Sequence, residues 1–161
     1  MTVGTETMPS RLRKSQGANL TKIVFHRPKD APTQQETLWA ERLGKNLFRL
    51  DNTPWYARDC ALDDVICCEE EEGQLPRFTR VIRPSGNRTV RVFVPEAADR
   101  SAIKTEVFRI LDEAGCFYEE YGSDKGLIAV TIPHSIDHES VLAKLEDLEA
   151  AGSAYWESGN F

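Results

Sequence analysis

The chain has 161 residues, of which 40% are hydrophobic and 29% charged, and its formal net charge is −6. This composition is typical of a globular protein and excludes a disordered chain. The sequence contains no run near the roughly 18 apolar residues needed to cross a bilayer. Residues 1–20 lack the apolar segment of a signal peptide. We therefore expect a cytoplasmic protein that binds no membrane.

Charge is unevenly distributed along the chain. Residues 1–30 contain six Lys or Arg and two acidic residues, a net of +4, so residues 31–161 carry −10. Residues 1–20 show no hydrophobic periodicity and predict a mobile basic arm. The acidic body would repel nucleic acid and anionic membranes and attract basic partners.

Short strand-forming segments without a helical pattern follow the arm. They are expected at residues 22–25, 37–43, 46–50, 65–68, 78–82 and 88–94. The pair Gly44-Lys45 predicts a hairpin turn, and residues 84–87 predict a tight turn into the last of these strands. We expect residues 21–87 to form an antiparallel β subdomain, either a small curled sheet or a partial barrel.

The second half changes to a mixed pattern. Residues 99–114 place apolar side chains at helical spacing, with Asp99 as the N-cap and Gly115 after the last turn. A second helix begins after Asp137 and ends before Gly152. Strands are expected at residues 89–94, 116–121, 127–132 and 154–157. Residues 88–161 therefore predict a ferredoxin-like β-α-β-β-α-β unit, and the chain an α+β fold.

The two sides of this predicted sheet differ. The first and third strands are the most apolar, which favours central positions under helices. The side assigned to the helices carries Val90, Val92, Val94, Ile128, Val130 and Ile132. The other side carries Arg91, Phe93, Leu127, Ala129 and Thr131. That side is too apolar to remain fully solvated, so we expect the N-terminal strands or a partner to cover it.

Cysteine spacing argues against disulfides and zinc sites. Cys60, Cys67, Cys68 and Cys116 match neither pattern and are expected to be reduced. The four glutamates after Cys68 would raise a thiol pKa, which disfavours a nucleophile there.

Other signs of catalysis are missing from the sequence. His134 and His138 are four residues apart, but they straddle a strand-to-helix turn and have no third ligand nearby in sequence. Phosphate-binding glycine loops and nucleophile elbows are absent. The third strand of the predicted unit offers Leu127, Ala129 and Thr131 in place of the stacking aromatics of RNA-binding domains. We expect no catalytic residue, no metal, no cofactor and no nucleic-acid partner.

Candidate partner-binding residues come from exposed aromatics and from acidic clusters. Trp55 and Tyr56 follow Pro54 in a loop, where large aromatics are typical interface anchors. The candidates are Trp55, Tyr56, Glu69, Glu70, Glu71, Glu72 and Phe93. The alternatives are the more common roles of such residues: a solvated hairpin tip for the glutamates at 69–72, and a core or a seam between subdomains for large aromatics.

Several stretches carry a family resemblance. They are Glu36–Ala40, Phe48–Pro54, Asp63–Val65, Phe78–Ile82 and Ser85–Val92. From about residue 36 to the C-terminus the chain resembles a bacterial family classified only as a domain of unknown function, number 4265 of its series. The resemblance implies no activity and no catalytic residue.

These observations favour a non-enzymatic acidic protein that binds another protein, for example an immunity or antitoxin-like partner of a basic effector. A small-molecule sensor is the alternative, because such β-α-β-β-α-β units often pair through edge strands or sheet faces and bind ligands at the seam. Pairing of this kind would also allow a homodimer. An enzyme using scattered residues such as Cys116, His134 or His138 is the third hypothesis.

Overall fold

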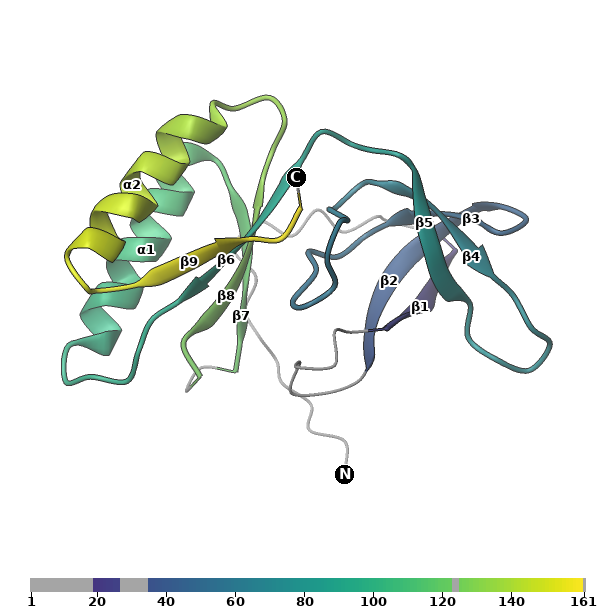
Figure 1. The fold of residues 1–161 in the computed structure, drawn as a ribbon, viewed down its shortest axis with the longest axis horizontal. Helices are drawn as coiled ribbons and strands as arrows, with labels where there is room; N and C mark the ends of the chain where they lie inside the picture. Colours follow the sequence, from purple (N-terminus) through teal and green to yellow (C-terminus); the bar gives the residue numbers. More distant parts are fainter. Residues whose placement is uncertain (1–18, 27–34, 123–124, 161) are drawn as a thin grey trace.

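The computed structural model describes residues 19–26, 35–122 and 125–160. Within these residues the chain forms nine strands and two helices, arranged as a barrel followed by a four-stranded sheet with a helical layer (Figure 1). The fold is thus α+β and mostly antiparallel. Residues 1–18 of the predicted arm lie outside the described part, and Leu20, also assigned to the arm, already belongs to the first strand.

The barrel contains the first five strands. They are β1 (Leu20–His26), β2 (Gln35–Gly44), β3 (Leu47–Leu50), β4 (Val65–Glu69) and β5 (Arg77–Arg83). Neighbours pair antiparallel in chain order until β5 meets β1 in a short parallel contact at Val24 and Arg77, which closes the barrel. The N–H of Val24 donates to the carbonyl of Pro76 at 2.9 Å there. The sequence predicted only a curled sheet or partial barrel, because a contact between such distant strands leaves no local pattern.

Alternating side chains fill the barrel. Strands β2 and β3 bury every second residue over most of their length, as a one-sided strand requires. The rings of Phe25 and Phe78 stack in the interior with centroids 4.6 Å apart. The β2–β3 turn lies at Lys45 and Asn46, one residue later than predicted, and Asn46 adopts a φ of 59°. Asn tolerates this left-handed conformation better than most residues.

The remaining elements form the sheet and its helical layer. They are β6 (Arg88–Phe93), α1 (Arg100–Ala114), β7 (Phe117–Tyr121), β8 (Leu127–Ile132), α2 (His138–Ala150) and β9 (Tyr155–Ser158). The strand order is β7-β8-β6-β9 with antiparallel neighbours, so β6 and β8 are central, as expected. Both helices lie on one side of the sheet (Figure 1). No helix of the described residues is long and apolar enough to span a membrane.

The side of the sheet under the helices is a continuous apolar core. Every side chain that the sequence assigned to this side is completely buried: Val90, Val92, Val94, Ile128, Val130 and Ile132. Helix α1 adds Val107 and Leu111, and α2 adds Leu145. The burial of these apolar side chains is what holds the helices to the sheet.

The residues that flank the two helices are those that the sequence predicted. Gly115 ends α1 with a φ of 79°, and Gly152 follows α2 with a φ of 70°. The Asp137 side chain accepts the N–H of Glu139 at 3.2 Å, which satisfies a donor of the first turn. Asp99 is the N-cap residue of α1, as predicted, and its carbonyl accepts the N–H of Ile103 at 3.0 Å, but its side chain makes no cap hydrogen bond.

The turn at residues 84–87 does not connect two paired strands, although the sequence predicted an antiparallel run through residue 94. Strand β5 belongs to the barrel and β6 to the sheet. The N–H of Ser85 donates to Asp64 Oδ1 at 2.7 Å, and Asn87 Nδ2 donates to the carbonyl of Leu62 at 2.9 Å. These bonds tie the turn to the loop before β4, so the chain crosses to the second unit.

Candidate functional site

The loop between β3 and β4, residues 51–64, joins the two units and is called the seam loop below. A carboxylate from the barrel holds it from one side. Glu36 on β2 is only 5% exposed and accepts the backbone N–H groups of Trp55, Tyr56 and Ala57 at 2.7, 3.0 and 2.7 Å. Three such bonds compensate a carboxylate for the loss of water.

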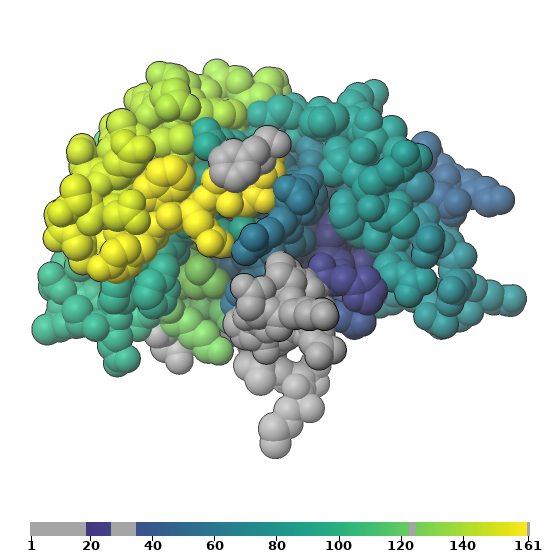
Figure 2. All heavy atoms as spheres, in the orientation of Figure 1, coloured from purple at the N-terminus to yellow at the C-terminus, as the bar shows by residue number. Residues whose placement is uncertain are grey.

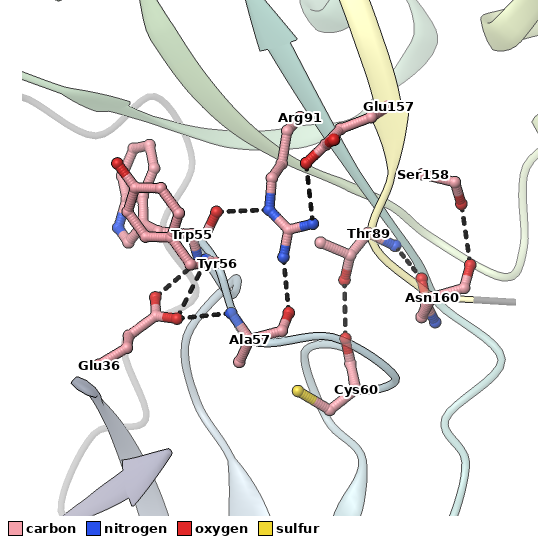
Figure 3. A network of polar contacts seen from close by, with 10 residues as sticks. All are labelled: Glu36, Trp55, Tyr56, Ala57, Cys60, Thr89, Arg91, Glu157, Ser158 and Asn160. Carbon is pink, nitrogen blue, oxygen red and sulfur yellow. Dashed lines mark hydrogen bonds and ion pairs between the residues drawn. The ribbon is translucent and has the colours of Figure 1, made fainter. Parts of the chain in front are cut away.

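A guanidinium from the sheet holds the seam loop from the other side (Figure 3). Arg91 on β6 is 5% exposed, and its Nε and Nη2 donate to the carbonyls of Trp55 and Ala57, the latter at 2.6 Å. Its Nη1 lies 3.5 Å from Glu157 Oε1. Burial lowers the pKa of Arg91, but a guanidinium keeps its charge in proteins. Two of these loop residues, Trp55 and Ala57, are thus fixed by opposite charges from the two units.

Further polar contacts complete the seam. The hydroxyls of Thr53 and Thr131 lie 2.7 Å apart, and the Thr89 hydroxyl donates to the carbonyl of Cys60 at 3.1 Å. The Asp59 N–H donates to the carbonyl of Gly159 at 3.0 Å, and Figure 2 shows the yellow C-terminal residues reaching the boundary between the units. The seam loop therefore covers much of the sheet face opposite the helices, which is called the back face below. The sequence predicted that the N-terminal strands or a partner would cover this face.

One end of the back face stays open to solvent. Cross-strand pairing places Tyr121 beside Leu127, Leu127 beside Phe93, and Phe93 beside Tyr155. These four residues, called the apolar row below, therefore share one face. Tyr121, Phe93 and Tyr155 are 40%, 44% and 47% exposed. A contiguous exposed apolar surface of this kind marks an interaction site more often than scattered apolar residues do.

The loop aromatics extend the apolar row. The ring centroids of Trp55 and Tyr56 lie 5.3 and 6.4 Å from that of Tyr121. Both residues are half-buried at the seam. They therefore pack against Tyr121 of the row and do not project freely from the loop. The structure thus brings together three predicted partner-binding residues, Trp55, Tyr56 and Phe93, on one side of the sheet. It adds Tyr121 and Tyr155, which only the strand register could have identified.

The acidic cluster at residues 69–72 lies elsewhere, at the β4–β5 hairpin on the barrel end away from the sheet (Figure 1). Its charge is partly neutralised by the barrel's own arginines. Glu70 accepts from Arg42 at 2.6 Å and from the N–H of Asn46 at 3.0 Å, and its bond to Arg42 lowers the pKa of Glu70. Arg77 pairs with Glu69 at 3.1 Å. The predicted site residues therefore form two separate groups.

Most of the negative charge belongs to the sheet unit. Residues 88–161 contain 14 Asp or Glu against 7 Lys or Arg, a net of −7, whereas residues 1–87 carry +1. The exposed side of α2 contributes Glu146, Asp147 and Glu149. Of the net charge of −10 that residues 31–161 carry, −7 therefore belongs to the unit that presents the apolar row.

Two hollows adjoin these surfaces. One of about 190 Å³, called the row hollow below, is lined by Arg91, Phe93, Leu127, Tyr155, Trp156 and Glu157. The other, of about 350 Å³, lies against the barrel beside His26, Glu69 and Leu75. Sites for small molecules commonly have volumes of about 300–1,000 Å³, so only the second falls in that range.

The candidate nucleophiles and ligands of the sequence do not converge. All four cysteines are free thiols. Burial raises the pKa of Cys68 to about 12 and that of Cys116 to about 11, and it also raises the pKa of Cys60. Thiols this weakly acidic carry little of the thiolate that nucleophilic catalysis uses.

The two candidate histidines, His134 and His138, make local contacts at the start of α2. His134 is exposed and donates its N–H to Asn87 Oδ1 at 3.0 Å, while His138 Nε2 lies 3.0 Å from the carbonyl of Pro133. In the part of the chain that the structure describes, no three His, Cys, Asp or Glu side chains are grouped as metal ligands.

Comparisons with known proteins give a family and a fold. A family model described as a domain of unknown function (DUF4265) matches residues 36–156. The crystal structure of a hypothetical protein from Neisseria gonorrhoeae is similar with a TM-score of 0.72 at 17% identity, covering 89% of this chain and 94% of that one. This likeness shows a shared fold alone. No curated protein matches the chain.

Proposed function

Because the chain belongs to the family described as a domain of unknown function (DUF4265), whose description names no activity, we propose a function from the surface itself: the protein binds another protein through the apolar row. One observation carries this proposal. Tyr121, Phe93 and Tyr155 are 40–47% exposed in one continuous row. Aromatic side chains on a firmly held surface are typical anchors of protein interfaces.

The charge of the sheet unit favours a basic partner. A net charge of −7 on residues 88–161 steers positively charged proteins toward the face that carries the row. A neutralising role toward a basic effector, as an immunity or antitoxin-like protein in the cytoplasm, fits this chemistry. No ligand, metal or catalytic group is required for such a role.

We also propose that the sheet unit is a ferredoxin-like module. The strand order β7-β8-β6-β9 with two helices on one side supports this assignment. Such units commonly use the sheet face away from the helices, or an edge strand, for association. In this chain the seam loop occupies most of that face, so the apolar row is the part left for a partner.

Site-specific photocross-linking in the native cytoplasm tests the proposal. A benzoyl-phenylalanine introduced at Phe93 or Tyr155 should yield one adduct of the same mass with a cellular protein. The matched control is Leu75, which is 49% exposed and belongs to the β4–β5 hairpin. That hairpin lies at the barrel end away from the sheet (Figure 1). Adducts at position 75 alone would move the binding site to Glu69–Glu72, and adducts at none of the three positions would contradict a protein-binding role.

Small-molecule sensing is the second candidate function. The 350 Å³ hollow beside His26 and Arg77 supports it, because its volume falls in the usual range for such ligands. A ligand that binds only the folded state raises the melting temperature, and the rise grows with the logarithm of ligand concentration above Kd. A thermal shift produced by a metabolite and abolished by Leu75→Arg, which would fill the hollow, would favour this function over protein binding.

A further inference from the structure

The row hollow is bounded by two exposed aromatic side chains. Phe93 and Tyr155 are direct cross-strand partners on β6 and β9 and are 44% and 47% exposed. Neighbouring positions of this kind hold Cβ atoms about 5 Å apart, so the two rings stand side by side. Leu127 and Trp156 complete the apolar part of the lining. At about 190 Å³, the hollow is of the order of one long side chain.

The charge that this hollow presents to solvent is negative. Arg91 also lines it, but Arg91 is 5% exposed and donates to the carbonyls of Trp55 and Ala57. The Glu157 side chain is 63% exposed, and its oxygen lies 3.5 Å from Arg91 Nη1, at the long end of a hydrogen bond. The Glu157 carboxylate therefore has accepting capacity left that faces the solvent side of the hollow.

The apolar row already accommodates one cation. The Lys125 ammonium lies 5.3 Å from the centroid of the Tyr121 ring, within the range of a cation–π interaction. Phe93 and Tyr155 offer two further ring faces at the other end of the row, and Glu157 adds a carboxylate beside them. Aromatic faces together with a carboxylate are the combination that recognises a guanidinium or an ammonium group.

We propose that the row hollow receives one Arg or Lys side chain of the protein partner. The cation lies against the rings of Phe93 and Tyr155 and pairs with Glu157, while the flanking apolar residues of the partner cover the rest of the row. This inference rests on the proposed function and names the chemistry of the partner: a basic segment with apolar neighbours. The net charge of −7 on residues 88–161 complements such a segment.

Short peptides test this pocket without knowledge of the natural partner. Three blocked pentapeptides, acetyl-Gly-Leu-Xaa-Leu-Gly-amide with Arg, Lys or Gln at the central position, are titrated into the full ¹⁵N-labelled chain. The amide resonances of Phe93, Tyr155 and Glu157 should shift with the Arg and Lys peptides. We expect the Gln peptide to bind about 3- to 30-fold more weakly, because it loses both the cation–π contact and the pairing with Glu157.

Two variants and a charge-matched control separate the pocket from general electrostatics. Phe93→Leu removes the ring but keeps apolar bulk, and Glu157→Gln removes the charge but keeps the shape. Each variant should weaken the binding of the Arg peptide about two- to fivefold and leave the affinity for the Gln peptide unchanged. Glu149→Gln removes the same charge from the exposed surface of α2 and should change neither affinity.

Several outcomes would contradict the proposal that the row hollow receives a cationic side chain. They are equal binding of the Arg and Gln peptides, an equal loss in the Glu149 and Glu157 variants, shifts centred on Glu69–Glu72, and no shift with any peptide. None of these decides the proposed function, because cross-linking at Phe93 reports on a partner whatever side chain it inserts. Apolar docking without a cation would appear as a Gln peptide that shifts the row as strongly as the Arg peptide does.

Discussion

The two faces of the four-stranded sheet are covered in chemically different ways. The helix side buries only apolar side chains along β6 and β8, for example Val90, Val92 and Val130, all at 0% exposure. The back face buries Arg91 and Thr131 against the seam loop. Apolar burial is non-directional, whereas buried polar groups need particular partners at particular distances. Both faces therefore contribute to stability, but the helix side does so without exact geometry, whereas the back face also fixes how the barrel sits on the sheet.

Removing the central carboxylate of the seam should have the largest effect. Glu36→Ala leaves the N–H groups of Trp55, Tyr56 and Ala57 buried without an acceptor, and we expect a loss of about 3–5 kcal/mol in unfolding free energy. Urea denaturation measures this loss. Glu36→Gln should recover only part of it, because an amide NH₂ would face donors, while Glu149→Ala should cost less than about 0.5 kcal/mol. A small loss for Glu36→Ala would show that the seam contributes little to stability.

Truncation on the helix side should cost somewhat less and should respond differently to conservative replacement. Leu111 of α1 is fully buried in the sheet core, so Leu111→Ala should cost about 2–5 kcal/mol. Leu111→Met should cost less than about 1.5 kcal/mol, because apolar packing tolerates side chains of similar volume. The contrast between the two faces fails if Leu111→Met is as damaging as Glu36→Gln in the same urea assay.

The same contrast explains what the sequence could and could not predict. The helix side has a local pattern: alternating Val and Ile residues in β6 and β8, and Gly115 and Asp137 at helix ends, indicated the elements and the central strands. The back face has none, because Glu36 is just one of the alternating residues of β2 until the seam loop is placed against it. The turn at residues 84–87 looks like a hairpin turn for the same reason, since only distant contacts decide whether its flanking strands pair.

The apolar row also shows how far the sequence alone could predict a binding surface. Trp55 and Phe93 could be selected as unusual aromatics in the sequence. Leu127 could be placed on the same side as Phe93, but Tyr121 could not, because it joins the row only through the pairing of β7 with β8. The charge of the glutamates at 69–72 made them candidate partner-binding residues as well, but the fold places them at the end of the barrel away from the apolar row.

The carboxylate of Glu119 on β7 makes the stability of the back face sensitive to pH. Burial raises the pKa of Glu119 above its ordinary value, a hydrogen bond with Asn52 opposes the rise, and Asp51 adds to it. Below the unfolded-state pKa the carboxyl is protonated in both states, and ionisation costs stability as the pH rises through the folded-state pKa. Glu119→Gln should therefore melt higher than the parent chain at neutral pH, and the gain should vanish below about pH 4. An equal gain at both pH values would assign the effect to packing.

The smallest change in stability should come from the apolar row, and it separates binding from folding. Val92 and Phe93 are neighbours in β6 that point to opposite faces, and they are 0% and 44% exposed. Val92→Ala should cost more than about 1 kcal/mol, because it opens a cavity under the helices. Phe93→Ala should change the unfolding free energy by less than about 0.5 kcal/mol, yet it should abolish the adduct formed from a benzoyl-phenylalanine at position 155. If Phe93→Ala destabilised the chain as much as Val92→Ala did, the exposed ring would be part of the core, and the row would have no surface to offer a partner.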